Sequence, residues 1–228
     1  MFFFDGFSDG IFGAIMGDYS GGAIGGITGG IKANKMGLNF WDGEGVIETP
    51  FDNSLVGIGK NLEYSNESLD DFINKNEELF KLSANVDEVH ADGTGPKNYK
   101  FKNGYLVNSK GSRVNGATSI SRVRGSSRMI IRTYLSKGVF KSSAQLYMTV
   151  HHEFMHANFW SFQLGFSSAD QHAIINNWHY DQLKAWKLTR RASLFTNPYS
   201  TFSKYFKSKN PNHYTFFGFK TITTLPRY

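Results

Sequence analysis

The 228-residue chain contains no cysteine. This absence excludes a disulfide-stapled scaffold, a zinc site built from thiolates and a cysteine nucleophile. The first ten residues hold no lysine or arginine, and Asp5 and Asp9 interrupt their apolar run, so they do not match a secretory signal peptide. No run of 18 apolar residues occurs, so we expect no ordinary transmembrane helix.

Each half of the chain is poor in charge of one sign. Residues 1–90 hold 15 acidic residues and 5 Lys/Arg, a net charge of −10, whereas residues 91–228 hold 4 acidic residues and 20 Lys/Arg, a net charge of +16. This division predicts two segments with different partners. The basic segment could meet nucleic acid, an anionic membrane or an acidic protein, although a soluble basic domain without such a partner fits equally well.

The first 45 residues are rich in glycine. Glycines at 13, 17, 21, 25 and 29 repeat every four residues, which in a helix would form a stripe of small residues able to pack against another helix or a membrane partner. Glycine disfavours helix by about 1 kcal/mol per residue relative to alanine, so a flexible arm is the alternative. We therefore divide the chain into an arm, residues 1–45, and a folded domain, residues 46–228, with an acidic helical part (46–90) and a basic part (91–228).

Aromatic residues make up 16% of the chain and favour strands. Residues 65–85 are typical of a helix capped by Ser68, and Asn103-Gly104 is typical of a hairpin turn. Strands are predicted at Tyr99–Val107, Ala117–Val123 and Arg128–Leu135.

Two further helices follow these strands. Ser142-Ser143-Ala144-Gln145 matches a capping box and predicts a helix to about Leu164, ended by Gly165. A second helix is predicted from about Ser168 to Arg190. The tail, residues 192–228, alternates aromatic and polar residues without a clear period and could form strands or loops.

The first of these helices contains His152-Glu153-Phe154-Met155-His156, the H-E-x-x-H pattern. Helical residues four apart differ by about 40° in direction, so His152 and His156 point the same way and can share one Zn²⁺. Glu153 lies about 100° round the helix, where it can reach a water molecule beside the metal. The motif predicts a hydrolytic zinc site, against the alternative of surface histidines on an amphipathic helix.

Residues 147–186 resemble the zincin metallopeptidases, because Thr149, Phe154, Met155 and Ala157 fit the extended pattern around the motif and Asn158 departs from it. Phe159 and Phe162 stand where the metzincins carry a glycine and a third histidine, so that branch is excluded. The resemblance implies an α+β, zincin-like fold, in which an active-site helix and a ligand-bearing helix pack on a small, mostly antiparallel sheet. It also implies a zinc endopeptidase, with Glu153 as the base that activates water.

The resemblance further implies a third zinc ligand in the second helix. His172 is the favoured residue and Asp170 the alternative, since the two point about 160° apart and only one can bind. Asp181 or His151 could hydrogen-bond a zinc-binding histidine at the ring nitrogen that does not contact the metal. His179, two turns after His172, is a weaker candidate ligand. The strand Arg128–Leu135 is expected to be the sheet edge along which an extended substrate pairs.

Residues 25–45, GGITGGIKANKMGLNFWDGEG, resemble the junction in bacterial polymorphic toxins between a YD-repeat (Rhs-type) shell and its C-terminal toxin domain. This resemblance implies a secreted effector delivered into a target cell, with an upstream shell, a secretion apparatus and a cognate immunity protein as partners, and a protein or peptide as substrate. We expect no nucleic-acid partner, while the arm could contact a membrane. A metal-dependent nuclease toxin and a non-catalytic structural module are the alternatives.

Overall fold

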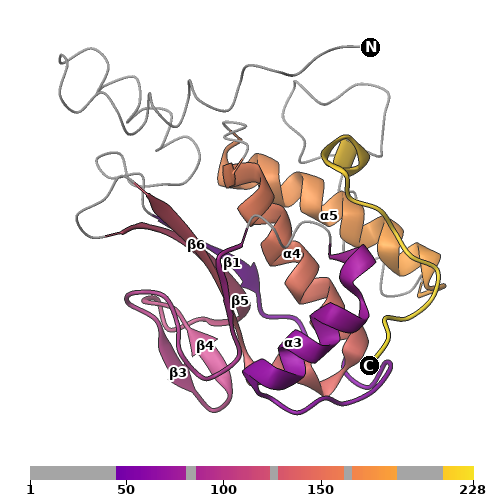
Figure 1. Cartoon of the computed structure of the whole chain (residues 1–228), viewed down its shortest axis with the longest axis horizontal. Helices are drawn as coiled ribbons and strands as arrows, with labels where there is room; N and C mark the ends of the chain where they lie inside the picture. The colour runs from indigo at the N-terminus through magenta and orange to yellow at the C-terminus, as the bar shows by residue number, and fades with distance from the viewer. Residues whose placement is uncertain (1–44, 81–85, 124–127, 162–165, 189–212) are drawn as a thin grey trace.

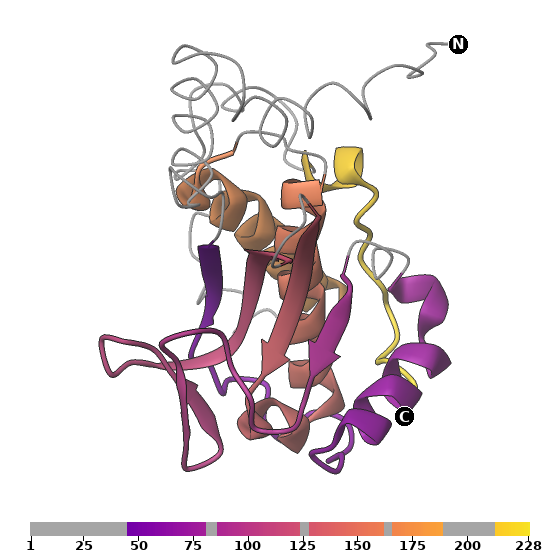
Figure 2. The same ribbon diagram turned by 60° about the vertical axis from the view of Figure 1, so that its left-hand side comes forward.

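The computed structural model describes residues 45–80, 86–123, 128–161, 166–188 and 213–228. Within these residues the protein is an α+β fold, with a six-stranded, mostly antiparallel sheet and two long helices on one face of it (Figures 1 and 2). The predicted fold class is confirmed at this level. All of the predicted arm except Gly45 lies outside the described residues.

The sheet is built around one long central strand, β5, which pairs with β6 and, beyond the end of β6, with β4 along one edge, and with β1 along the other. Only the pairing of β2 with β6 is parallel. The six strands are β1 (Gly45–Pro50), β2 (Glu88–His90), β3 (Lys100–Lys102), β4 (Tyr105–Val107), β5 (Arg113–Arg122) and β6 (Met129–Leu135).

The predicted hairpin at Asn103-Gly104 is confirmed. It joins β3 to β4, and both turn residues have positive φ (53° and 81°), which Asn and Gly tolerate best. Strands β1 and β2 were not predicted. Each is short, and each finds its partner far along the chain, so local sequence carries little trace of them.

The expectation that Arg128–Leu135 forms a sheet edge is wrong. Strand β6 lies between β5 and β2, because Glu88–His90 adds to its outer side. Strand β1 borders the two helices, and no described strand pairs with its outer edge (Figure 2).

The helices are α3 (Asn66–Lys75), α4 (Ser143–Ser161) and α5 (Ser168–Ala185), together with 3₁₀ turns η2 (Glu77–Leu79), η4 (Lys137–Lys141) and η7 (His213–Phe217). Ser65, not Ser68, caps α3, since its hydroxyl accepts from the Ser68 N–H at 3.1 Å. The predicted helix over 65–85 is correspondingly shorter, and residues 81–85 lie outside the described part. None of the described helices combines the length and apolar composition needed to cross a membrane.

Helix α4 is the centre of the molecule, and every residue in it except Ser161 is buried. The predicted cap at Ser142 is confirmed, because its hydroxyl accepts from the Gln145 N–H at 3.2 Å. The predicted end at Leu164-Gly165 lies outside the described residues. The helix packs on β1, β5 and β6 with one side and on α5 with another, which explains why it shows no polar face.

Helix α5 begins at Ser168, as predicted, and ends at Ala185 rather than Arg190. Lys187 takes φ +61°, which stops the helix. Beyond η7 the chain runs back along α5 as an extended segment (Figure 1). Gln182 holds that segment with two hydrogen bonds to the backbone of Ile222, and Asn76 does the same for Arg227.

Candidate metal centre

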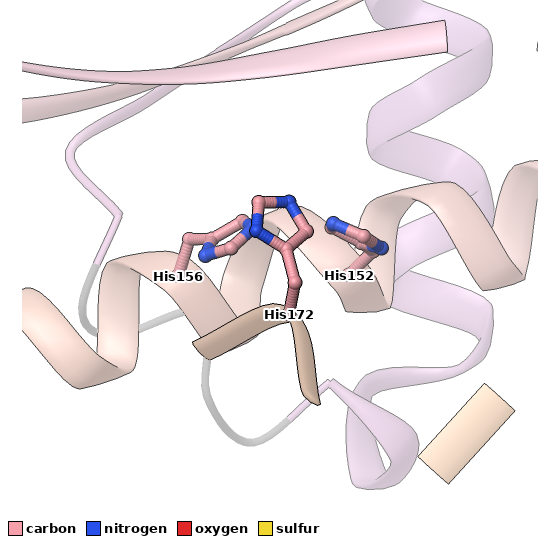
Figure 3. Close-up of side chains that lie close together, drawn as sticks. All are labelled: His152, His156 and His172. Carbon is pink, nitrogen blue, oxygen red and sulfur yellow. The ribbon is translucent and has the colours of Figure 1, made fainter. Parts of the chain in front are cut away.

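Helices α4 and α5 bring three imidazoles together. His152 and His156 project from successive turns of α4, and His172 projects from the first turns of α5 between them (Figure 3). One ring nitrogen from each lies within 4.8 Å of the others. The ring centroids of His156 and His172 are 4.8 Å apart. The helical spacing of the motif therefore produces the convergence that the sequence predicted.

The orientation of His156 is fixed by Gln171. His156 Nδ1 lies 2.9 Å from Gln171 Oε1, and Gln171 Nε2 donates to the Phe166 carbonyl at 3.2 Å. Because the second bond uses the amide nitrogen, the oxygen must face the ring, and Nδ1 carries the proton. His156 Nε2 is then an unprotonated nitrogen, buried without a hydrogen-bond partner among the described residues.

His172 is held by backbone carbonyls. Its Nδ1 lies 2.8 Å from the Ser168 carbonyl oxygen and its Nε2 lies 3.2 Å from that of Glu48 on β1. A neutral imidazole has one proton and can donate to only one of the two. Donation from Nδ1 to Ser168 leaves Nε2 unprotonated, with a lone pair that could bind a metal, beside the Glu48 carbonyl.

His152 has no hydrogen-bond partner on either nitrogen among the described residues, although it is buried. Burial lowers its pKa well below 6.5, and the neighbouring imidazoles His156, His179 and His172 lower it further. Buried polar atoms without partners are costly, so they call for a ligand. Three neutral imidazole nitrogens suit a borderline transition-metal ion such as Zn²⁺ and suit Mg²⁺ or Ca²⁺ poorly.

The carboxylate of Glu153 points from α4 toward the sheet, into a cradle formed by β1 and β5. Thr49 Oγ1 on β1 donates to Oε1 at 2.5 Å, and Thr118 Oγ1 on β5 donates to Oε2 at 2.6 Å. Between them, Gly116 leaves room for the side chain, because a Cβ there would lie 2.6 Å from Oε1. Register explains the arrangement, since Thr49 pairs with Gly116 and Thr118 follows on the same face of β5.

Complete burial raises the pKa of Glu153 to about 7, and the hydrogen bonds from Thr118 and Thr49 oppose that rise. Thr118 Oγ1 is itself 3.0 Å from Thr133 Oγ1 on β6. Through the Glu153 carboxylate, the hydroxyls of Thr49, Thr118 and Thr133 therefore form a hydrogen-bonded chain across three strands. The backbone N–H of Thr49 also donates to this carboxylate, so three donors hold it. Glu153 is therefore rigidly held and titrates near neutral pH.

A cavity of about 590 Å³ lies beside the imidazoles. His152 and His172 form part of its wall, and so does Thr49, while Glu153 lies behind Thr49 and is not itself exposed to the cavity. The cavity continues past the cluster along the N-terminal half of α4. A molecule in it would meet two of the three converging imidazoles.

The other predicted site residues lie outside the cluster. Asp170 is engaged at the start of α5, where its N–H donates to Ser167 Oγ and its carboxylate accepts from the same hydroxyl. Asp181 accepts from Tyr214 at 2.9 Å, and burial raises its pKa.

His151 stacks on Trp178 with ring centroids 4.4 Å apart, and no described residue hydrogen-bonds to its nitrogens. It lies within the aromatic core and contacts no member of the cluster in the described part of the chain. His179 is nearer, with its ring centroid 5.1 Å from that of His152, and it lines the cavity without joining the three converging nitrogens.

Four residues of the site were not predicted: Thr49, Gly116, Thr118 and Gln171. The threonines and the glycine reach Glu153 only through the pairing of β1 with β5, which local sequence does not reveal. Gln171 was open to prediction, since it stands 15 residues after His156, next to His172, and its amide oxygen is a suitable acceptor for an imidazole N–H.

The chain matches no protein-family model, no curated protein and no solved structure. The site must therefore be interpreted from its own chemistry.

Proposed function

We propose that the protein is a zinc-dependent endopeptidase, with the metal held by His152, His156 and His172 and with Glu153 as the general base. The observation that carries this proposal is the convergence of three buried or half-buried imidazoles, with unpartnered nitrogens on His152 and His156, on a helix that also carries the buried carboxylate of Glu153. When bound, the ion supplies Lewis acidity for the hydrolysis of an amide bond.

Glu153 accepts the proton of the attacking water and passes it to the leaving nitrogen. In the metal-free protein, burial raises the pKa of Glu153 to about 7, and a bound cation would lower it toward the range of an ionised base. Thr49 and Thr118 hold the two carboxylate oxygens, so the proposal requires the attacking water to reach Glu153 past Thr49, which lines the cavity. An extended substrate would pair with the outer edge of β1, next to the Glu48 carbonyl that contacts His172.

The alternatives fit the geometry less well. In a histidine–metal nuclease we expect a paired histidine at the end of a strand, whereas His151-His152 lies in the middle of α4. A structural zinc site usually has four protein ligands, and the cluster in the described residues supplies three. A site with three ligands leaves a position for water or substrate, as catalysis requires.

The test is cleavage of an unfolded protein mixture by the zinc-loaded full chain, read by labelling new N-termini. We expect new termini with the wild type and a loss of at least about 100-fold in Glu153→Gln. Glu153→Gln should still bind one zinc, since it keeps the three imidazoles. An unchanged cleavage rate in that variant would refute the role of Glu153, and no cleavage by a protein with stoichiometric zinc would refute the peptidase.

The biological setting rests on the toxin-junction resemblance of residues 25–45. We propose that the domain is an effector delivered into a target cell and neutralised by a cognate immunity protein, whose acidic surface would suit the +16 charge of residues 91–228. Production of the domain inside bacteria should arrest growth, and Glu153→Gln should relieve the arrest. Equal growth arrest by the variant would separate toxicity from peptidase chemistry.

A further inference from the structure

The cavity beside the imidazoles has a defined shape. One wall is a face of α4 that includes Met148, Thr149 and His152, a second is the face of α5 between His172 and His179, and the third is the segment from Thr49 to Leu55. Its volume of about 590 Å³ is in the range of pockets that bind small ligands or peptide side chains. Because two of the converging imidazoles belong to its wall, whatever fills it lies next to the reacting bond.

Part of the buried wall is apolar. Leu55 and Met148 are 2% and 3% exposed, and Phe51 forms the rim, where it packs edge-on against Tyr105 with ring centroids 5.3 Å apart. An apolar side chain that enters this cavity exchanges water for these side chains. Burial of an aromatic or long aliphatic side chain is worth far more than that of alanine.

The wall carries almost no charge. No lysine or arginine lines the cavity, so no described residue there could pair with a carboxylate. The one acidic residue, Asp52, already accepts from the N–H and the hydroxyl of Ser54, at 2.8 and 2.9 Å. A carboxylate side chain would therefore lose its water without gaining a cationic partner, and a cationic side chain would find only the already engaged Asp52.

Besides the nitrogens of His152, one hydroxyl in the wall is without a partner among the described residues. The hydroxyl of Thr149 is buried, lines the cavity and makes no hydrogen bond to any described residue. It stands one turn before His152 and Glu153 on α4. It can therefore bond to a polar atom of a substrate that lies along this helix, which is what a peptide backbone beside a buried side chain offers.

We infer that this cavity is the specificity site of the enzyme, an inference that rests on the proposed peptidase function. It accepts a large uncharged side chain, aromatic or long aliphatic, from the substrate residue adjacent to the cleaved bond. Charged residues and glycine are rejected at that position. Phe51, Leu55 and Met148 determine the preference.

The experiment is a cleavage profile of a peptide library made from a bacterial proteome, with the zinc-loaded full chain and mass spectrometry of the products. We expect large uncharged residues at one position beside the cut to be enriched at least about tenfold over Gly, Asp, Glu and Lys. Met148→Trp, whose larger side chain fills the cavity, should shift the preferred substrate residue at that position to Ala or Ser.

Phe51→Ala gives a second variant at a position that is 41% exposed and therefore safe for folding. It should weaken the preference by about 3- to 10-fold, as expected for loss of one aromatic contact. Val56→Ala is the matched control, since Val56 is 40% exposed in the same loop and does not line the cavity; its profile should equal that of the wild type.

Failure of the inference can be told apart from failure of the function. Cleavage with no side-chain preference, with a preference for charged residues, or with a preference that both Met148→Trp and Phe51→Ala leave unchanged would overturn the specificity site and leave the peptidase standing. Absence of any cleavage by protein shown to contain one zinc per chain would overturn both.

Discussion

The two sides of helix α4 differ in how their buried polar groups are satisfied. On the side facing α5, His152 Nδ1 and Nε2 and His156 Nε2 have no hydrogen-bond partner among the described residues. On the side facing the sheet, both oxygens of Glu153 accept a threonine hydroxyl. The first arrangement is complete only when a ligand binds, whereas the second is complete beforehand. One helix therefore carries imidazoles that are free to accept a ligand and a carboxylate that is already fixed in position.

The largest expected effect is on the α5 side. His152→Ala removes one of the three proposed ligands. Loss of a residue that only hydrogen-bonds a ligand lowers metal affinity by roughly 10- to 100-fold, so loss of the ligand itself should lower zinc affinity by more than that. Competition with a chelator would measure the affinity, and elemental analysis the stoichiometry. His90→Ala is the matched control, because His90 lies on β2 between Glu88 and Asp92, away from the cluster. Equal loss in both variants would mean that the imidazoles are not ligands.

The second effect concerns pH on the sheet side. The pKa of Glu153 rises from 4.5 to about 7 in the folded protein, so the folded state binds more protons than the unfolded state between these values. Stability from this group is fully present below pH 4.5 and is lost as the pH rises through 7. Glu153→Gln has no group that titrates here. The difference in unfolding free energy between the metal-free variant and the metal-free wild type should therefore shift by about 3 kcal/mol in favour of the variant between pH 4.5 and 8.

Urea unfolding of both proteins in the presence of a chelator measures this difference. The buried histidines also titrate: burial lowers the pKa of His151 and His179 to about 3, so their stabilisation is lost as the pH falls below 6.5. That contribution is common to both proteins and cancels in the comparison. A difference between wild type and variant that does not change with pH would contradict the buried carboxylate.

The third effect concerns the hydrogen bond that orients the His156 ring. Gln171→Leu deprives His156 Nδ1 of its acceptor and should reduce zinc affinity by about 10- to 100-fold. Gln182→Leu is the control, since Gln182 is equally buried on α5 but bonds to the backbone of Ile222. It should destabilise the fold and leave zinc affinity unchanged. The same affinity loss in both variants would show a general effect of unfolding.

The smallest effect is the loss of one hydroxyl from the sheet side. Thr118→Val keeps the shape of the side chain and removes one donor to Glu153, which should cost about 1 to 2 kcal/mol of unfolding free energy. Thr118→Ser keeps the hydroxyl and should lie closer to the wild type. Equal stability of the valine variant and the wild type would show that the hydrogen bond contributes nothing net.

Sequence reasoning succeeded where the controlling interactions are local. The helix that carries His152 and His156, its cap at Ser142 and the turn at Asn103-Gly104 all depend on residues within a few positions of one another. Because a turn of helix fixes the direction of its side chains, the convergence of the two imidazoles was predictable from spacing alone.

It failed where the contacts are distant. Thr49 lies 104 positions before Glu153 and reaches it only through pairing of β1 with β5. The wrong edge strand has the same origin, since Glu88–His90 pairs with β6 across more than 40 positions. Asp170 shows a subtler limit, because a carboxylate near a metal site can equally serve as a helix-cap partner, and here Ser167 engages it.

Strand β1 is only six residues long, yet it supplies a hydroxyl to Glu153, a carbonyl that contacts His172 and part of the cavity wall. Its pairing with β5 is what holds all three features in place. A small displacement of this one strand would therefore reach the carboxylate, the imidazole cluster and the cavity at the same time.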